Sequence, residues 1–417
     1  MRAAANAPPN APAKAPAVLV TGCGVAAPNG LGTDAYWAAT LAGRSGIGPV
    51  TLFDARGYPS RLAGEIQDFA PRDHLPVRLI PQTDRMTQLA LATAEFAFDD
   101  AGVRPSDAGD YGAGVVTAAT AGGYAFGERE LRNLWSEGPD HVSAYQSFAW
   151  FYAVNTGQIS IRHGIRGASG ALVTEGAGGL DALGQARRLI RGGQPLMLAG
   201  GVDSSLCSWG WVGHLSSGRI SGSAAHDRAY LPFDRAADGH VPGEGGALLV
   251  LEDADAARRR GARALGAIAG YAATFDPPPD SGRPGNLARA IRAALADAGV
   301  GPGDIGVVIA DAAAVPDLDR AEADAVTAVF GPGGVPVTAP KTMTGRLGAG
   351  GGALDVVTAL LALRDGVIPP TVHSVPDPAH GLDLVTVARR APLTAALVLA
   401  RGSGGFNSAV VVTAPTR

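Results

Sequence analysis

Residues 170–191 read GALVTEGAGGLDALGQARRLIR, and this stretch decides the fold. Residues 171–174 predict a short buried strand, residues 176–179 a glycine-rich turn, and residues 180–190 a helix with apolar residues near helical spacing. Such an elbow can hold a nucleophile at a helix N-terminus, where free N–H groups and the helix dipole stabilise an anion. The turn, however, contains only glycine and alanine. Considered alone, the segment is also compatible with an ordinary glycine-rich helix start.

Strands and helices alternate along the chain in two successive halves, which predicts an α/β fold of two layered units. We expect a disordered Ala/Pro-rich tail over 1–16, a first half over 17–260 and a second half over 261–417. In the first half we expect strands over 18–21, 112–117, 196–203 and 245–252 and a helix over 85–102. In the second half we expect strands or strand ends over 266–274, 305–310 and 336–340, helices over 286–298, 319–330 and 352–364, and a closing hairpin over 394–412.

Composition excludes several function classes. The 34 basic and 38 acidic residues give a net charge of −4, so nothing favours nucleic acid or an anionic membrane as a partner. Two cysteines support no disulfide framework, none of the histidines shows metal-ligand spacing, and no apolar run is long enough to span a membrane. We expect no metal and a cytoplasmic location. Gly22, Gly24 and Ala27 loosely match a dinucleotide-binding fingerprint, but Pro28 interrupts the helix that must follow, so we expect no cofactor.

The elbow and the opening segment VTGCGVAAPNGLG (20–32) resemble the β-ketoacyl synthases, which are condensing enzymes of the thiolase fold. In that family a cysteine precedes a small-residue turn and the pattern Gly-hydrophobic-Asp-Ala. Aligned on residues 179–182, the cysteine position falls on Gly176. The resemblance implies two pseudosymmetric mixed-sheet units in a five-layer α-β-α-β-α arrangement.

Two further family motifs carry catalytic histidines, and this chain matches both motifs without the histidine. The first resembles IADAAAVPDLDRAEADAV (309–326), where the histidine position is Ala313. The second resembles KTMTGR (341–346), where the histidine position is Arg346. None of the eight histidines falls in either motif. We therefore expect no catalytic residue at the degenerate positions Gly176, Ala313 and Arg346.

This triple substitution resembles the chain length factor, or ketosynthase beta subunit, of bacterial type II polyketide synthases. The resemblance implies two partners: a ketosynthase alpha subunit that supplies the catalytic residues in a heterodimer, and an acyl carrier protein that carries the chain as a phosphopantetheine thioester. It also implies an interface tunnel whose depth sets chain length. In that family the elbow position is commonly glutamine, for which a decarboxylating role has been argued, and Gly176 departs from this pattern.

The wall-forming positions of the family tunnel fall on Tyr124, Gly127, Leu131 and Trp209. The first three are spaced by three and four residues, as on one helical face, and core packing would give the same spacing. Because Gly127 has no side chain and Leu131 is smaller than an aromatic residue, we hypothesise a deep tunnel and a product longer than an octaketide.

Alternative interpretations remain open at the level of sequence. The chain could be an active acyltransferase with an unusual nucleophile, or a scaffold that stabilises its partner without shaping a tunnel. An aromatic cluster could stack a ligand, although core or subunit-interface packing is the more ordinary use. Three arginines on the predicted elbow helix could dock a carrier protein or simply form a solvated face. The residues concerned are Ser204, Ser205 and Cys207 as nucleophiles; Tyr145, Phe148, Trp150, Phe151 and Tyr152 as the aromatic cluster; and Arg187, Arg188 and Arg191 as the arginines.

Overall fold

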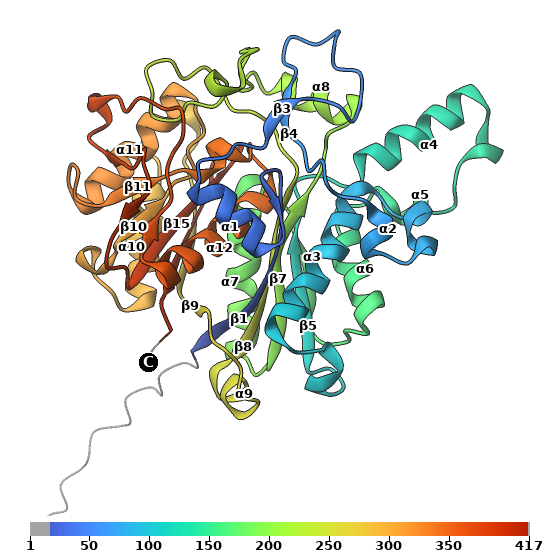
Figure 1. Ribbon diagram of the computed structural model, residues 1–417, viewed down its shortest axis with the longest axis horizontal. Coiled ribbons are helices and arrows are strands. Elements are labelled where there is room, and N and C mark those ends of the chain that lie inside the picture. Colours follow the sequence, from blue (N-terminus) through green and yellow to red (C-terminus); the bar gives the residue numbers. More distant parts are fainter. Residues whose placement is uncertain (1–16, 416–417) are drawn as a thin grey trace, which may run out of the picture.

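Two sheet halves with the same order of strand directions form the framework of the protein. A computed structural model describes residues 17–415 (Figure 1), so the predicted tail over 1–16 lies outside the described residues. The first half has the order β1 (Val18–Ala27), β8 (Gly245–Asp253), β7 (Leu196–Asp203), β5 (Ala113–Ala118), β6 (Ser169–Leu172). The second has the order β9 (Gly266–Phe275), β16 (Phe406–Thr413), β15 (Ala395–Gly402), β10 (Val307–Ile309), β11 (Pro336–Thr338), with β13 (Asp383–Leu384) at its edge.

The directions of these strands repeat between the halves. In each half the first two strand pairs are antiparallel and the next two are parallel. The halves meet where Leu19 and Val20 of β1 pair with Ala267 and Gly266 of β9. The two predicted units are therefore present, each is a mixed sheet, and they are related by pseudosymmetry.

Helices fill three layers around these sheets, which completes the expected α-β-α-β-α order. In the middle layer, α7 (Gly178–Arg191) and α12 (Ala349–Asp365) contact strands of both halves. On the outer face of the first half, α3 (Arg85–Ala101) and α6 (Val154–His163) pack together, and α10 (Leu287–Ala298) and α11 (Pro316–Phe330) cover the second half. Figure 1 shows α7 and α12 between the two sets of strands.

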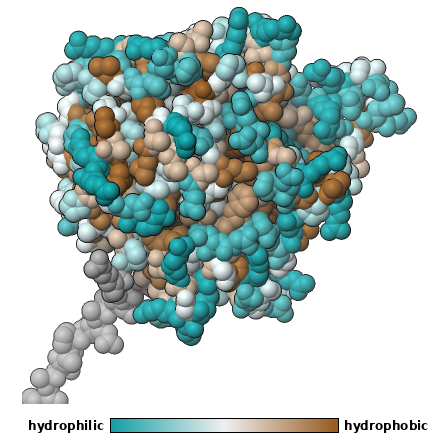
Figure 2. Space-filling view, viewed as in Figure 1, coloured by the Kyte–Doolittle hydropathy of each residue, from teal (hydrophilic) through white to brown (hydrophobic). Residues whose placement is uncertain are grey.

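Shorter elements connect these layers. They are β2 (Gly30–Leu31), α1 (Thr33–Leu41), β3 (Ile47–Pro49), β4 (Leu62–Gly64), α2 (Pro71–His74), α4 (Tyr124–Ser136), α5 (Gln146–Ala149), α8 (Ser208–Ser216), α9 (Ala254–Arg259), β12 (Val367–Ile368) and β14 (Arg389–Arg390). Of these, α4 projects from the body (Figure 1), and the tip of this projection is mainly hydrophilic in Figure 2. Within residues 17–415 no helix combines the length and the apolar character needed to cross a membrane.

The glycines of the opening segment serve packing. β1 is longer than predicted and runs through Gly22 and Gly24, which lie directly on α3. A β-carbon at Gly24 would stand 2.0 Å from the carbonyl oxygen of Thr93, and one at Gly22 would stand 2.5 Å from that of Ala97. These glycines therefore allow close contact between a strand and a helix, and they do not form a phosphate-binding turn.

Several predicted elements differ from the structure in bounds or burial, and two of these differences have a physical reason. The elbow strand was expected to be buried, whereas β6 is the edge strand of the first half and its residues are half-buried or exposed. A short apolar run does not show whether a strand lies at the centre or at the edge of a sheet. Helix α11 begins at Pro316, three residues before the predicted start, because proline fits the first turn of a helix, where no intrahelical N–H bond is lost.

Candidate functional site

The elbow after β6 is closed by neighbouring backbone. A short 3-10 turn (Glu175–Ala177) precedes α7 and buries Gly176. A β-carbon at Gly176 would stand 2.5 Å from the carbonyl oxygen of Arg401 on β15 and 3.1 Å from Nη2 of Arg346. The first distance is shorter than any relaxed contact between such atoms. The backbone at position 176 therefore accommodates glycine. The space that a nucleophilic side chain would need is occupied by Arg401 and Arg346.

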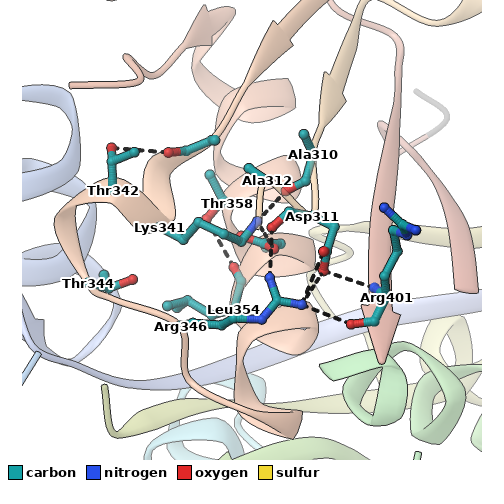
Figure 3. Close-up of polar contacts among 12 residues, drawn as sticks. Ala310, Asp311, Ala312, Lys341, Thr342, Thr344, Arg346, Leu354, Thr358 and Arg401 are labelled. Atoms are coloured by element: carbon teal, nitrogen blue, oxygen red, sulfur yellow. Dashed lines mark hydrogen bonds and ion pairs between the residues drawn. The ribbon is translucent and has the colours of Figure 1, made fainter. Parts of the chain in front are cut away.

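Arg346 forms the centre of the site through an ion pair with Asp311 (Figure 3). Its Nη2 donates to both carboxylate oxygens of Asp311, at 2.9 and 3.0 Å, and to the carbonyl oxygen of Arg401 at 2.9 Å. Burial alone would raise the pKa of Asp311, but the charges of Arg346, Lys341 and Arg401 outweigh burial and hold that pKa below its ordinary value. The pair is charged at neutral pH, and the donors of Nη2 are used within the protein.

The motif around Ala313 is held by carboxylates that bind backbone. Glu322 accepts hydrogen bonds from the N–H groups of Asp311 (2.7 Å) and Ala312 (2.8 Å). Asp319 accepts one from the N–H group of Phe233 at 2.8 Å. The loop is conformationally demanding, because Ala312 has φ +50°. The acidic residues of the motif thus have a structural task that does not depend on a histidine at 313.

The motif that ends in Arg346 is anchored in the same way. Nζ of Lys341 lies 2.9 Å from Oδ2 of Asp355 on α12 and also donates to the carbonyl oxygen of Ala310 (Figure 3). Both side chains are buried. These contacts give a physical reason why both motifs are recognisable although their histidines are absent: their other residues hold the loops in place.

A further donor beside the elbow is engaged within the protein. The N–H group of Ser403, in the loop after β15, donates to Glu175 at 2.7 Å. An oxyanion hole requires donors that are free to bind developing negative charge. Here Arg346 binds Asp311 and Ser403 binds Glu175, while position 176 has no side chain. The Nη2 donors of Arg346 are therefore not free to bind an oxyanion. Within residues 17–415 no group of three or more histidine, cysteine or acidic side chains is placed to hold a metal ion.

Comparison with protein families assigns both halves of the chain. Residues 15–257 match the model described as "Beta-ketoacyl synthase, N-terminal domain", and residues 265–375 match "Beta-ketoacyl synthase, C-terminal domain". The tetracenomycin polyketide synthase ketoacyl synthase beta subunit of Streptomyces glaucescens is 61% identical over 399 residues, covering 95% of this chain and 98% of its own length. The chain is a ketosynthase beta subunit of the beta-ketoacyl synthase family.

Further relatives agree with this assignment. The actinorhodin polyketide beta-ketoacyl synthase 2 of Streptomyces coelicolor is 63% identical over 96% of this chain and 99% of its own length. Among solved structures, the ishigamide ketosynthase/chain length factor superposes with a TM-score of 0.86 at 28% identity, over 97% of this beta subunit and 100% of that chain. A type II PKS acyl-carrier protein in complex with its ketosynthase gives 0.86 at 29% identity, over 96% and 100%. The thiolase-like fold expected from the sequence is confirmed.

Three of the four predicted tunnel residues of this beta subunit meet between α4 and α8. The rings of Tyr124 and Trp209 are stacked, with centroids 5.2 Å apart and planes 16° apart. A β-carbon at Gly127 would stand 3.2 Å from the Trp209 ring, so that ring fills the space beside Gly127. Leu131 is half-buried and lies one turn further along α4. The expected helical face exists, and Trp209 joins it from a distant segment.

Sequence reasoning missed two histidines that line a cavity of about 550 Å³ beside the degenerate site. His214 and His240 share its walls with Glu175, Ala313 and Arg346. Burial lowers the pKa of His214, and burial together with the charge of Arg346 lowers that of His240 to about 3. Both rings are neutral at pH 7. Neither histidine stands in a recognisable motif, so no signal in the sequence could have placed them here.

The three alternative nucleophiles do not line this cavity. Ser204 donates to Glu244 at 2.8 Å in a buried contact. Ser205 does have a possible base, since its Oγ lies 2.7 Å from Nε2 of His214, but of this pair only the histidine lines the cavity. Burial raises the pKa of Cys207 to about 12, which keeps its thiol protonated and unreactive.

Proposed function

We propose that this chain is the non-condensing subunit of a heterodimeric type II polyketide ketosynthase, in which it shapes the interface tunnel that sets polyketide chain length. The observation that carries this proposal is the filled elbow, where Gly176 meets Arg346 and the backbone of Arg401. A chain with no side chain at the elbow position and no histidine in either family motif needs a partner that supplies these catalytic groups. The solved relative named as a ketosynthase/chain length factor is consistent with such a pairing.

Exposed aromatic residues support a protein partner on one side of the molecule. Trp150, Phe151 and Tyr152 are 51%, 40% and 43% exposed, and they follow α5 close to the projecting helix α4. Edge strand β6 presents unpaired backbone groups, and Val173 beside it is 48% exposed. Aromatic clusters and open strand edges are features of protein interfaces. We assign the ketosynthase alpha subunit to this surface.

Chain-length control in this proposal is steric. A packed protein wall does not yield to an additional ketide unit without strain. The stacked pair Tyr124–Trp209 and the α4 face with Gly127 and Leu131 form that wall. The second partner is the acyl carrier protein, in line with the solved complex of a carrier protein with its ketosynthase. A product longer than an octaketide remains our prediction. In the structure the Trp209 ring occupies the space beside Gly127.

The remaining assignments follow from the same proposal. We assign the boundary between the ketosynthase-like halves to residues 260 and 261, because β9 begins the second run of strand directions shortly after α9 ends. We place the assembly in the cytoplasm, where malonyl thioesters on carrier proteins are made, and the described residues contain no helix suited to a membrane.

Co-expression with a ketosynthase alpha subunit tests the function. We expect a one-to-one complex by size exclusion and malonyl-dependent products by mass spectrometry. In that complex Gly127→Phe should shorten the product and Trp209→Ala should lengthen it. Trp135→Ala is the matched control, because Trp135 lies on the same helix and is 79% exposed. Unchanged product length in intact complexes of both tunnel variants would leave only the scaffold interpretation, and condensation by the chain alone would contradict the proposal.

A further inference from the structure

Glu128 connects the two helices that carry the proposed tunnel wall. It lies on α4 directly after Gly127, and its carboxylate reaches the first turn of α8. Oε1 accepts a hydrogen bond from the hydroxyl group of Ser208 at 2.5 Å, and Oε2 accepts one from the backbone N–H group of Trp209 at 3.0 Å. Arg132, one turn further along α4, donates to Oε1 at 3.0 Å. One side chain thus joins α4 to the backbone of Trp209.

The hydrogen bonds between Glu128 and α8 are strong, although the Glu128 side chain is partly exposed. The Glu128 side chain is 21% exposed, and burial would raise its pKa, but the donors from Ser208, Trp209 and Arg132 outweigh burial and lower that pKa, so the carboxylate is charged at neutral pH. A charged oxygen satisfies an N–H group of the first helical turn that has no partner within α8, and it lies at the positive end of the helix dipole.

Trp209 depends on this connection more than its neighbour Trp211 does. Trp211 is fully buried, and its indole N–H group donates to the carbonyl oxygen of Ser60 at 3.2 Å. The Trp209 side chain is 46% exposed and has the stacking contact with Tyr124 as its main support. The position of its ring over Gly127 therefore requires that the start of α8 stays against α4.

We infer that Glu128 is a positioning residue for chain-length selection, because it ties the start of α8 to α4 and thereby keeps the Trp209 ring over Gly127. This inference rests on the proposed function. Glu128 does not itself need to contact the growing chain. Its role is to hold the Trp209 ring in one position. If the ring could take several positions, the depth of the tunnel would vary and the complex would release products of several lengths.

The test compares variants of the reconstituted complex by product analysis. In Glu128→Ala the ratio of longer to normal products should rise at least about tenfold, because the variant loses both hydrogen bonds to α8 and one bond to a charged group alone carries that weight in a conformational equilibrium. Glu128→Gln keeps one acceptor oxygen and should give a smaller rise, as should Ser208→Ala, which removes one donor and leaves the carboxylate. Glu137→Ala is the control, because Glu137 directly follows α4, is 56% exposed and pairs with His141.

A second readout does not depend on activity. The chain is labelled with fluorotryptophan and assembled with unlabelled partner, and the ¹⁹F resonance of Trp209 is assigned by its loss in Trp209→Phe. Glu128→Ala should shift or broaden this resonance, whereas Glu137→Ala should not. In addition, Glu128→Ala should have no further effect on product length in a Trp209→Ala background, since the glutamate acts through the tryptophan.

The outcomes separate the two proposals. If Trp209→Ala lengthens the product while Glu128→Ala changes neither the product nor the resonance, the role of Glu128 is refuted and the proposed function stands. If the effects of Glu128→Ala and Trp209→Ala on length add fully, Glu128 acts by another route and the inference is wrong. If neither tunnel variant changes the product of an intact complex, the proposed length control fails first.

Discussion

Nη2 of Arg346 lies 3.1 Å from the position that a β-carbon on Gly176 would occupy. The two residues are separated by 170 positions in the sequence, and together they close one site: position 176 has no side chain, and the guanidinium group fills the adjoining space. Because Nη2 also binds Asp311 and the carbonyl oxygen of Arg401, its position is fixed by two partners. The glycine at the nucleophile position and the arginine at one of the two histidine positions are therefore in direct steric contact.

Restoring the cysteine alone should not restore condensation. In Gly176→Cys the new β-carbon would meet the carbonyl oxygen of Arg401 at 2.5 Å, so backbone must move. We expect no malonyl condensation by the chain itself and a loss of about 1–3 kcal/mol in the free energy of unfolding, which is usual for overpacking. Urea denaturation and product analysis check both. Unchanged stability would show that the elbow has more room than the structure indicates. Gly213→Cys on α8 is the control, because a β-carbon at Gly213 meets nothing within 4 Å.

Breaking the central ion pair should be costly. Arg346→Gln leaves the buried carboxylate of Asp311 without its main counter-charge, and removal of one partner of a buried pair costs about 3–5 kcal/mol. Arg346→Lys keeps the positive charge but loses the planar guanidinium group that binds both carboxylate oxygens of Asp311. Its loss of stability should therefore be intermediate. The midpoint of thermal unfolding of the complex gives the order of the three proteins. Equal stability of Arg346→Gln and the unmodified protein would refute the structural role of the pair.

The pH dependence of stability should carry a contribution from Asp319. Burial raises the pKa of this group from 3.8 to about 7, and the nearby Glu322 charge acts in the same direction. Between pH 4 and pH 7 the folded protein holds a proton that the unfolded chain has released, so this contribution to stability is largest below pH 4 and is lost as pH rises to 7. Its size is on the order of 4 kcal/mol.

Asp319→Asn removes this titration and keeps an acceptor for the N–H group of Phe233. The difference in unfolding free energy between the unmodified protein and the variant should therefore shift in favour of the variant as pH rises from 5 to 8. Asp317→Asn, at an exposed position on the same helix, should show no such shift. Parallel behaviour of Asp319→Asn and the unmodified protein at both pH values would contradict the prediction.

A charge within the exposed aromatic cluster should weaken the heterodimer. Phe151→Asp places a carboxylate among Trp150 and Tyr152, where assembly would desolvate it, and loss of an interface hot spot costs 2 kcal/mol or more, about thirtyfold in affinity. Val387→Asp is the control, because Val387 is 76% exposed in the other half of the chain. Size exclusion at decreasing concentration measures the dissociation. Equal dissociation of both variants would place the interface elsewhere.

The elements of the fold could be predicted to within a few residues, because their apolar spacing is local. Strand β7 has the predicted bounds, and α10 begins one residue after its predicted start. The grouping of Gly176 with Arg346 was implied by the family resemblance and is present. What packs against these residues depends on tertiary contacts that no local pattern contains. Examples are the carbonyl oxygen of Arg401 against Gly176, the ring of Trp209 over Gly127, and the two histidines in the cavity wall.

The closed elbow has a consequence for how this protein could change over time. Its three obstacles support one another: β15 excludes a side chain at Gly176, Arg346 occupies the adjoining space, and Asp311 and Glu322 fix the loops that hold both. We expect a single substitution that regained one catalytic group to lose stability without gaining turnover. The packing of the fold around the elbow therefore maintains the dependence of this chain on a catalytic partner.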